Sequence, residues 1–299
     1  MRAMDAVVID GLRKSFGSVH AVEDVSLSVA VGESFGYLGP NGAGKTTTIR
    51  CLLGFIRPTA GHMTVFDLDV ATHLNEVLAR IGYLPGEFGL WPSMTGAEVL
   101  DYLGDLHPSP PSRRDELLDR FELSRADLGR QVRFYSRGMR QKIGIVQAFE
   151  HAPELIVLDE PTEGLDPVMK DRFVGLLREH RARGGTTFMS SHILSEVELA
   201  TDRVGVVKEG RMVRVGSAQD LTGERVRHCV LTLKEPAAPG SLDVPGVSEL
   251  VAEDGIHLRF EYRGDMEPLM KALLRVKVLE FLAEPESLTE AFFDVYGER

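Results

Sequence analysis

The chain has 299 residues, enough for one large domain and a smaller one, or for two domains of moderate size. Hydrophobic residues make up 43% and charged residues 26%, a balance that is typical of a folded globular protein and excludes a mainly disordered chain. The formal net charge of −11 disfavours binding through a strong positive field, so no nucleic-acid partner is expected. Cys51 and Cys229 share no metal-ligand spacing, which argues against a disulfide scaffold or a zinc module and fits a reducing cytosolic compartment.

The sequence contains no segment that is expected to span a membrane. Uncharged stretches are short and rich in glycine, such as residues 34–44, whereas a spanning helix needs about 20 mostly apolar residues. The apolar run at residues 6–9 is shorter than the roughly 7–15 residues of a signal-peptide core. If the protein acts at a membrane, a partner must supply the membrane part.

The N-terminal elements are predicted to be short strands followed by a loop and a helix. Residues 6–9 and 25–29 are β-branched or alternate in hydrophobicity, and glycines separate them. Residues 35–38 form an apolar run that leads directly into a glycine-rich turn. Residues 46–53 then contain no helix breaker before Gly54. The order is strand, glycine loop, helix.

The middle of the chain alternates between helices and strands. Thr95 and Glu98 have the spacing of a capping box, and Asp166-Pro167 is a typical helix start. The predicted helices cover residues 95–107, 114–121, 138–149, 167–183 and 194–200. The predicted strands cover residues 155–158, 186–189 and 204–207. This alternation predicts an α/β fold with a parallel or mixed sheet.

The pattern changes near residues 219–224, and the rest of the chain resembles a small α+β unit. Asp254-Gly255 predicts a hairpin turn. Further predicted elements are a helix at residues 265–274, a strand at 276–281 and a terminal helix at 287–296. We therefore expect an N-terminal domain at residues 1–221, with a helical subdomain at about 87–150, and an accessory domain at residues 222–299.

Residues 39–46 carry the strongest chemical signal, because GPNGAGKT matches the phosphate-loop pattern G-x-x-x-x-G-K-[ST]. The glycines let backbone N–H groups point at a phosphate, and the following helix directs its positive end to the same anion. Lys45 is expected to reach the β- and γ-phosphates, and Thr46 to bind Mg²⁺. An accidental glycine-rich turn is the alternative, which the flanking strand and helix disfavour. The predicted contacts to ATP are Gly39, Pro40, Asn41, Gly42, Ala43, Gly44, Lys45, Thr46 and Thr47.

Two acidic residues follow the apolar run at residues 155–158. Asp159 would lie at the sheet edge, where a phosphate-bound Mg²⁺ is expected. Glu160 would point elsewhere and act as a general base toward the attacking water. A strand that simply reaches solvent gives the same pattern, so the interpretation depends on the phosphate loop.

Residues 134–142, FYSRGMRQK, resemble the signature of ATP-binding-cassette (ABC) ATPases. Ser136 and Gly138 match the family pattern, whereas Arg137 replaces its first glycine. The resemblance implies that Ser136, at a helix N-terminus, contacts the γ-phosphate of ATP held by the opposite subunit. A serine-capped basic helix without this role is the alternative.

Three further segments occur in the order of this family, and the resemblance covers about residues 5–220. Residues 163–166 are similar to the D-loop, which includes Asp166. Residues 190–192 resemble the switch segment, in which His192 contacts the γ-phosphate. Phe16 corresponds to the aromatic residue that stacks on adenine. Taken singly, a histidine after a strand or a phenylalanine is as well explained by structural packing.

One position departs from the family pattern. Gly86 stands where the family usually has a glutamine that contacts the metal or the attacking water, and Glu87 follows it. Glycine has no side-chain ligand, so either Glu87 or water completes the metal shell. We expect weaker coupling between the metal and this loop than in relatives with glutamine.

The resemblance implies an ABC cassette of the P-loop NTPase class, with a mixed sheet core, a helical subdomain and a small C-terminal α+β domain. It implies an ATPase that uses ATP and Mg²⁺ and drives a separate transmembrane permease. The ATPase is expected to dimerise around two ATP molecules, with a second copy of itself or with a homologous ATPase. The expected place is the cytoplasmic face of the membrane, and the expected cargo is a drug, an antibiotic or a lipid-like compound leaving the cell. An importer ATPase and a non-transport ABC ATPase with a cytosolic partner stay open as alternatives.

The segment at residues 86–106 corresponds to the region that receives the permease in this family. Phe88, Leu90 and Trp91 are its apolar candidates, although Trp91 is equally well explained by core packing. The region at about residues 222–299 carries no catalytic or metal-ligating pattern. We interpret it as an assembly or regulatory appendage.

Overall fold

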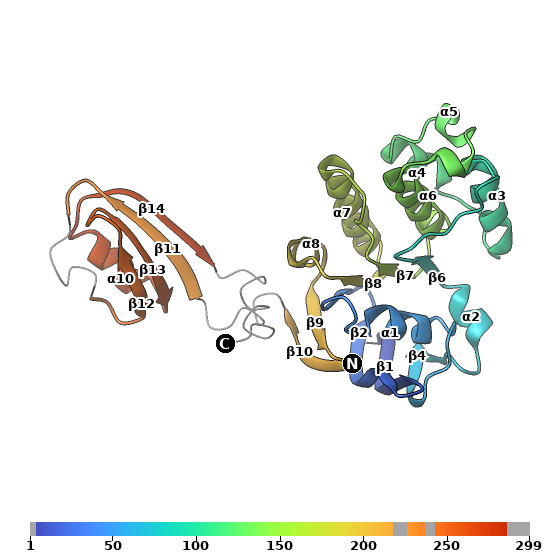
Figure 1. Cartoon of the computed structure of the whole chain (residues 1–299), viewed down its shortest axis with the longest axis horizontal. Helices are drawn as coiled ribbons and strands as arrows, with labels where there is room; N and C mark the ends of the chain where they lie inside the picture. Colours follow the sequence, from blue (N-terminus) through green and yellow to red (C-terminus); the bar gives the residue numbers. More distant parts are fainter. Residues whose placement is uncertain (1–3, 218–225, 237–242, 286–299) are drawn as a thin grey trace. The chain divides into compact units, whose positions relative to one another are not determined.

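The computed structural model describes residues 4–217, 226–236 and 243–285. Contacts divide the chain into two compact units, residues 1–215 and 216–299, each of which is described by itself (Figure 1). The boundary predicted at residues 221/222 falls within 218–225, outside the described residues. None of the described helices combines the length and hydrophobicity that crossing a bilayer requires.

A ten-stranded mixed sheet forms the centre of the first unit, in the order β5-β4-β1-β2-β10-β9-β3-β8-β7-β6. Antiparallel pairing joins β1, β2, β4 and β5, whereas β9, β3, β8, β7 and β6 pair in parallel. The strands are β1 (Asp5–Phe16), β2 (Val19–Ala30), β3 (Ser34–Leu38), β4 (Ala60–Val65), β5 (Leu68–Asp69), β6 (Ile81–Leu84), β7 (Leu155–Asp159), β8 (Thr186–Ser191), β9 (Arg203–Lys208) and β10 (Arg211–Ser217).

The first two strands are longer than the sequence indicated. Each has 12 residues, since β1 continues through Gly11 and β2 begins at Val19, six residues before the predicted start at residue 25. The register between β1 and β2 shifts between Ile9 and Leu12, and Gly11 has a φ of 58° at this irregularity. Glycine therefore marks a bulge within the hairpin and not the end of a strand.

Four helices, α3 to α6, form the helical subdomain beside β6 (Figure 1). The sequence placed its limits at about residues 87–150, and these helices lie within them. The helices of the first unit are α1 (Lys45–Leu52), α2 (Leu74–Leu78), α3 (Gly96–Leu106), α4 (Arg114–Arg120), α5 (Arg125–Leu128), α6 (Arg137–Phe149), α7 (Pro167–Ala182) and α8 (Leu194–Ala200).

The predicted helix starts are confirmed by side-chain hydrogen bonds. Thr95 caps α3 in a reciprocal capping box with Glu98, whose carboxylate accepts from the Thr95 backbone N–H at 2.8 Å. Asp166 caps α7 by accepting from the Met169 backbone N–H at 3.0 Å, with Pro167 in the first turn. Such caps stabilise a helix by about 1 kcal/mol and fix where it begins.

The central strands β3, β7 and β8 are buried along their whole length. Phe188 of β8 packs against two rings of β3, with ring centroids 5.8 Å from Phe35 and 5.5 Å from Tyr37. Parallel pairing places the carboxyl ends of these strands at one edge of the sheet, the usual place for a ligand in an open α/β sheet. The phosphate loop follows β3, Asp159 is the last residue of β7, and His192 follows β8.

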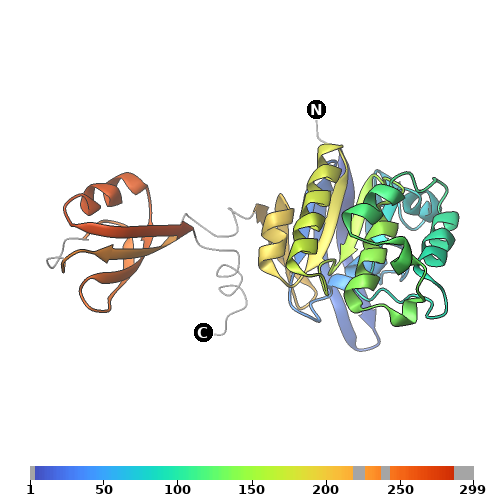
Figure 2. The same cartoon turned by 90° about the horizontal axis from the view of Figure 1, so that it is seen from above.

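The second unit is a four-stranded antiparallel sheet in the order β12-β13-β11-β14. Figure 2 shows its single described helix, α10 (Met266–Leu273), lying over one face of the sheet. Strand residues such as Leu231 and Phe260 form a core with Leu269 of this helix. The strands are β11 (Val226–Leu233), β12 (Val247–Ala252), β13 (His257–Arg263) and β14 (Val278–Pro285).

Predictions for this unit are partly confirmed. The turn at Asp254-Gly255 joins β12 to β13, and the Asp254 carboxylate accepts from the His257 backbone N–H at 2.8 Å. The helix is present, and the last strand begins and ends later than residues 276–281. The helix predicted at residues 287–296 lies outside the described residues.

Replacing Phe188 with alanine is expected to lower the free energy of unfolding of the first unit by about 3–5 kcal/mol, because it leaves a cavity between β8 and β3. Urea unfolding followed by circular dichroism measures the loss. Phe134→Ala is the matched control, since that ring is 60% exposed and its loss is expected to cost less than about 0.5 kcal/mol. Equal losses in the two variants would contradict the central role of Phe188.

Candidate functional site

The loop between β3 and α1 requires glycine at several positions. Gly42 and Gly44 have φ values of 83° and 99°, in the left-handed region that side chains disfavour. A Cβ atom on Gly44 would lie 2.4 Å from the Ala21 carbonyl oxygen, and one on Gly39 would lie 2.5 Å from the Val207 carbonyl oxygen. The first turn of α1 then begins at Lys45 and directs backbone N–H groups toward the loop. This local geometry is that of an anion-binding turn.

The Lys45 side chain is 6% exposed and folds back over the loop. Its Nζ atom donates to the Gly39 carbonyl oxygen at 2.6 Å and to the Pro40 carbonyl oxygen at 3.2 Å. The same Nζ atom lies 3.3 Å from Oε1 of Glu160. The cation at the start of α1 is therefore paired with the acid that follows β7.

Asp159 is hydrogen-bonded to Thr46, the other residue predicted to bind a metal, and also to Ser190. Its Oδ2 atom accepts a hydrogen bond from Thr46 Oγ1 at 2.8 Å, and its Oδ1 atom accepts from Ser190 Oγ at 2.5 Å. The residue is only 3% exposed, so these two donors satisfy a buried carboxylate. Ser190 belongs to the predicted switch segment, but its bond to Asp159 was not predicted. Its position near the end of the strand beside β7 is the signal that could have indicated this bond.

Glu160 points away from Asp159 and toward His192. Its φ of 50° turns the chain sharply at the end of β7, while its backbone N–H donates to the Ser190 carbonyl oxygen at 3.1 Å. The Glu160 Oε2 atom lies 2.8 Å from Nδ1 of His192 and accepts from the His192 backbone N–H at 3.3 Å. An unfavourable backbone conformation is thus held by contacts with the next strand.

The other predicted site residues lie in separate local groups. Ser136 caps α6 by accepting from the Met139 backbone N–H at 3.2 Å. Gly138 approaches the D-loop closely, since a Cβ atom on it would lie 2.7 Å from the Gly164 carbonyl oxygen. Phe16, at the end of β1, is 50% exposed, with Lys14 Nζ 4.8 Å from its ring centroid.

Bonds within the described residues therefore bring Lys45, Thr46, Asp159, Glu160 and His192 into one network. The capping bonds of Ser136 and Asp166 stay within the first turns of their own helices. The predicted site residues therefore lie in three places: this network, the starts of α6 and α7 beside the D-loop, and Phe16 at the end of β1.

Gly86 lies directly against Asp159. A Cβ atom on Gly86 would be 3.3 Å from the Asp159 carbonyl oxygen and 3.5 Å from its Oδ2 atom. Nearby, burial and the charge of Asp159 raise the pKa of Tyr83 to about 12. Glu87 is exposed. A longer side chain at position 86 would begin beside the predicted metal ligand.

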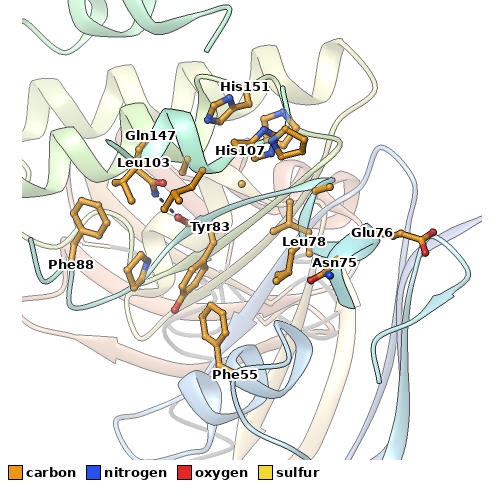
Figure 3. A pocket seen from close by; sticks show the side chains of 18 residues that line it. Phe55, Asn75, Glu76, Leu78, Tyr83, Phe88, Leu103, His107, Gln147 and His151 are labelled. Carbon is orange, nitrogen blue, oxygen red and sulfur yellow. Dashed lines mark hydrogen bonds between the residues drawn. The ribbon is translucent and has the colours of Figure 1, made fainter. Parts of the chain in front are cut away.

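A cavity of about 860 Å³ lies next to the site, between β6 and the helical subdomain (Figure 3). Its walls include Phe55, Tyr83, Phe88 and Leu103, and its upper side in the figure carries His107 and His151. The two histidine rings stack with centroids 4.0 Å apart, and burial lowers the pKa of both.

Two of the three apolar candidates in residues 86–106 are not among the lining residues. Phe88 lines the cavity, but Leu90 and Trp91 do not. Trp91 is 44% exposed and packs edge-on against Tyr102 at 5.0 Å. Core packing does not explain such an exposed ring. The lining residues Leu103 and Leu106 were missed because their helical spacing alone does not tell which face is open.

Comparisons with known proteins agree with this geometry. Residues 22–163 match the family model described as ABC transporter. The bacitracin transport ATP-binding protein BcrA of Bacillus licheniformis is 33% identical over 96% of this chain and 95% of its own length. A Nostoc protein named as an uncharacterized ABC transporter ATP-binding protein, all4389, is 42% identical over 69% of this chain and 63% of its own length.

A solved structure described as the ATP binding subunit of an ABC transporter superimposes with a TM-score of 0.67. It is 28% identical and covers 72% of this chain and 91% of its own. The expected cassette fold is therefore confirmed. The chain belongs to the ABC transporter ATP-binding proteins, a family of ATP-hydrolysing subunits.

Proposed function

We propose that this chain is the ATPase subunit of an ABC exporter that acts through a separate permease. The observation that carries the proposal is the network of Lys45, Thr46, Asp159, Glu160 and His192 at the carboxyl ends of three parallel strands. Similarity to a bacitracin transport protein along nearly the whole chain supports export of an antibiotic, a drug or a lipid-like compound.

ATP is assigned to the turn between β3 and α1. The backbone N–H groups of residues 39–47 and the Lys45 ammonium would hold the phosphates, and the exposed ring of Phe16 would stack on adenine. Lys45 already bonds to two carbonyl oxygens of the loop, so phosphate oxygens would replace acceptors that are in place.

Thr46 and Asp159 are the residues that would hold Mg²⁺. Both offer oxygen atoms, the ligands that Mg²⁺ prefers, and they lie within one hydrogen bond of each other at 2.8 Å. Among the described residues no group of three or more His, Cys, Asp or Glu is placed to hold a metal. Phosphate oxygens and water would therefore complete the shell. The bound ion would offset negative charge on the phosphates.

Glu160 is assigned as the general base and His192 as its partner. The carboxylate is 17% exposed and held from two sides, by Lys45 at 3.3 Å and by His192 at 2.8 Å. A carboxylate fixed in this way can accept a proton from a water molecule positioned at the γ-phosphate. His192, whose side chain is 42% exposed, would contact the same phosphate.

The group around Ser136 is assigned to a second copy of the chain. The N-terminus of α6 presents Ser136 and Gly138 close to the D-loop, and Arg137 pairs with Glu163. Two copies facing head to tail would place this helix end over the partner's phosphate loop, with Asp166 at the contact. ATP would close the dimer and its hydrolysis would open it.

The cavity beside β6 is assigned to the permease. Its apolar lining with a few polar groups suits an apolar helical segment of a membrane subunit, which would hold the chain at the cytoplasmic face of the membrane. A neighbouring reading frame for a permease with about six apolar segments of about 20 residues, and none for a binding protein, would favour export over import.

Replacing Glu160 with glutamine is expected to lower ATP turnover by about 10²–10⁴-fold, because the general base is lost. It should also give an ATP-bound dimer that gel filtration resolves from the monomer. Glu198→Gln on the exposed side of α8 is the control and should keep normal turnover. Full turnover of the Glu160→Gln chain would remove the catalytic assignment.

Replacing Gly86 with glutamine is expected to lower the Mg²⁺ concentration needed for half-maximal ATPase activity by about tenfold, since an amide would reach the predicted metal ligands. Gly89→Gln is the matched control, because nothing lies within 4 Å of a Cβ atom at that position. An unchanged Mg²⁺ dependence would count against the proposed effect of the missing glutamine.

Replacing Leu103 with glutamate is expected to reduce the fraction of the chain that sediments with membranes by more than tenfold, because a carboxylate would be buried in an apolar contact. Purified Leu103→Glu protein should keep its ATPase activity. Leu274→Glu, at a side chain 84% exposed, controls for added charge. Equal sedimentation of both variants would exclude the cavity as the permease contact.

A further inference from the structure

One buried carboxylate connects three segments of the first unit. Glu196, in α8, accepts a hydrogen bond from Thr162 Oγ1 and forms an ion pair with Lys170 of α7, whose Nζ atom lies 2.6 Å from Glu196 Oε1. Thr162 lies in the turn between β7 and α7. We call these three residues the Glu196 contact group.

Each member of the Glu196 contact group lies close in sequence to a proposed site residue. Thr162 comes two residues after Glu160, and Glu196 comes four residues, about one helical turn, after His192. Lys170 likewise comes four residues after Asp166, which caps α7. The contact group thus joins the segments that carry the general base, the phosphate-contacting histidine and the D-loop.

Two members of the contact group have little access to water. Glu196 is 12% exposed and Thr162 is 4% exposed, whereas Lys170 is 36% exposed. A buried carboxylate without partners would be strongly unfavourable, which ties Glu196 to Thr162 and Lys170. The helix α8 has no side-chain cap at Ile193. The Ile193 backbone N–H donates to Ser191 Oγ at 2.9 Å, and the Glu196 contacts add to this support of the first turn.

The turn that carries Thr162 is also held from other sides. The Leu165 backbone N–H donates to the Thr162 carbonyl oxygen at 3.1 Å, and the buried Gln141 side chain donates to the Pro161 carbonyl oxygen at 2.7 Å. These bonds make the turn a rigid support. The contact between Glu160 and His192 joins the same two segments near the phosphate loop. A displacement of α8 relative to this turn would therefore change that contact.

We propose that Glu196 is a positioning residue for ATP hydrolysis, which holds Glu160 and His192 in register through Thr162 and Lys170. The proposal rests on the roles assigned to Glu160 and His192 above. None of the hydrogen bonds and ion pairs described for Glu196 reaches the phosphate loop. Its loss should therefore slow turnover without weakening ATP binding, since positioning errors of about 1 Å can cost about 10²-fold in rate.

The test is Glu196→Ala in the full-length chain, with kcat measured by phosphate release and the Kd for Mg-ATP measured at equilibrium. We expect kcat to fall at least tenfold while Kd stays within about twofold. Glu198→Ala, two positions along the same helix and exposed, is the matched control and should keep kcat within about twofold. Glu196→Gln keeps an acceptor for Thr162 and should restore kcat to within about threefold of the unaltered chain.

Thr162→Val and Lys170→Met remove the two contacts of Glu196 one at a time and leave Glu196 itself in place. The test therefore does not depend on whether Glu196→Ala folds. Each should lower kcat with little change in Kd. The double variant Thr162→Val/Glu196→Ala should show no lower kcat than the slower of the two single variants, because both substitutions remove the same contact between Thr162 and Glu196.

Two results would overturn the proposal: kcat of Glu196→Ala equal to that of Glu198→Ala, or a rise in Kd that parallels the loss of kcat. Glu160→Gln separates this proposal from the proposed function. Full turnover of Glu160→Gln contradicts the site itself. An inactive Glu160→Gln beside a fully active Glu196→Ala contradicts only the positioning role.

Discussion

The pair of hydrogen bonds to Asp159 is the interaction on which the site depends. Thr46 comes from the helix after β3 and Ser190 from the end of β8, and both donate to this one carboxylate. Asp159 is almost fully buried, so leaving either oxygen unpaired would cost about 1–3 kcal/mol or more. These bonds add to the backbone pairing of β3, β8 and β7, and they hold the start of α1 beside the acid that ends β7.

A second set of charges lies in front of Asp159. Lys45 pairs with Glu160, and Glu160 in turn contacts the ring and backbone of His192. The three side chains form a continuous row from the start of α1 to the residues that directly follow β7 and β8. A triphosphate in the loop would compete with Glu160 for Lys45, so binding of the nucleotide and the state of the proposed base are linked. The Glu196 contact group adds a further connection between the segments that follow β7 and β8.

The segment between β6 and the helical subdomain connects this chemistry to the cavity. Gly86 lies against Asp159, whereas Tyr83 and Phe88, on either side of it, line the cavity. Gln147 of α6 donates to the Tyr83 carbonyl oxygen at 2.6 Å, which ties the segment to the signature helix. Glycine at position 86 offers no side chain to connect the proposed metal site with the cavity, whereas the Tyr83 side chain lines the cavity and is influenced by the charge of Asp159.

The sequence by itself determined the order of the motifs, the helix starts at Thr95, Ser136 and Asp166, and the hairpin turn at Asp254-Gly255, because each depends on residues only a few positions apart. The alternation of elements predicted an α/β fold, and the resemblance of the motif series to ABC ATPases implied the cassette and the residues around the phosphate loop. Tertiary structure alone decided that Ser190 bonds to Asp159, that Thr162, Lys170 and Glu196 meet, and that Leu103 faces a cavity. It also decided that β1 continues through Gly11. These contacts join residues that are distant in sequence or depend on a partner strand, and only the register of the sheet and the packing of its helices bring them together.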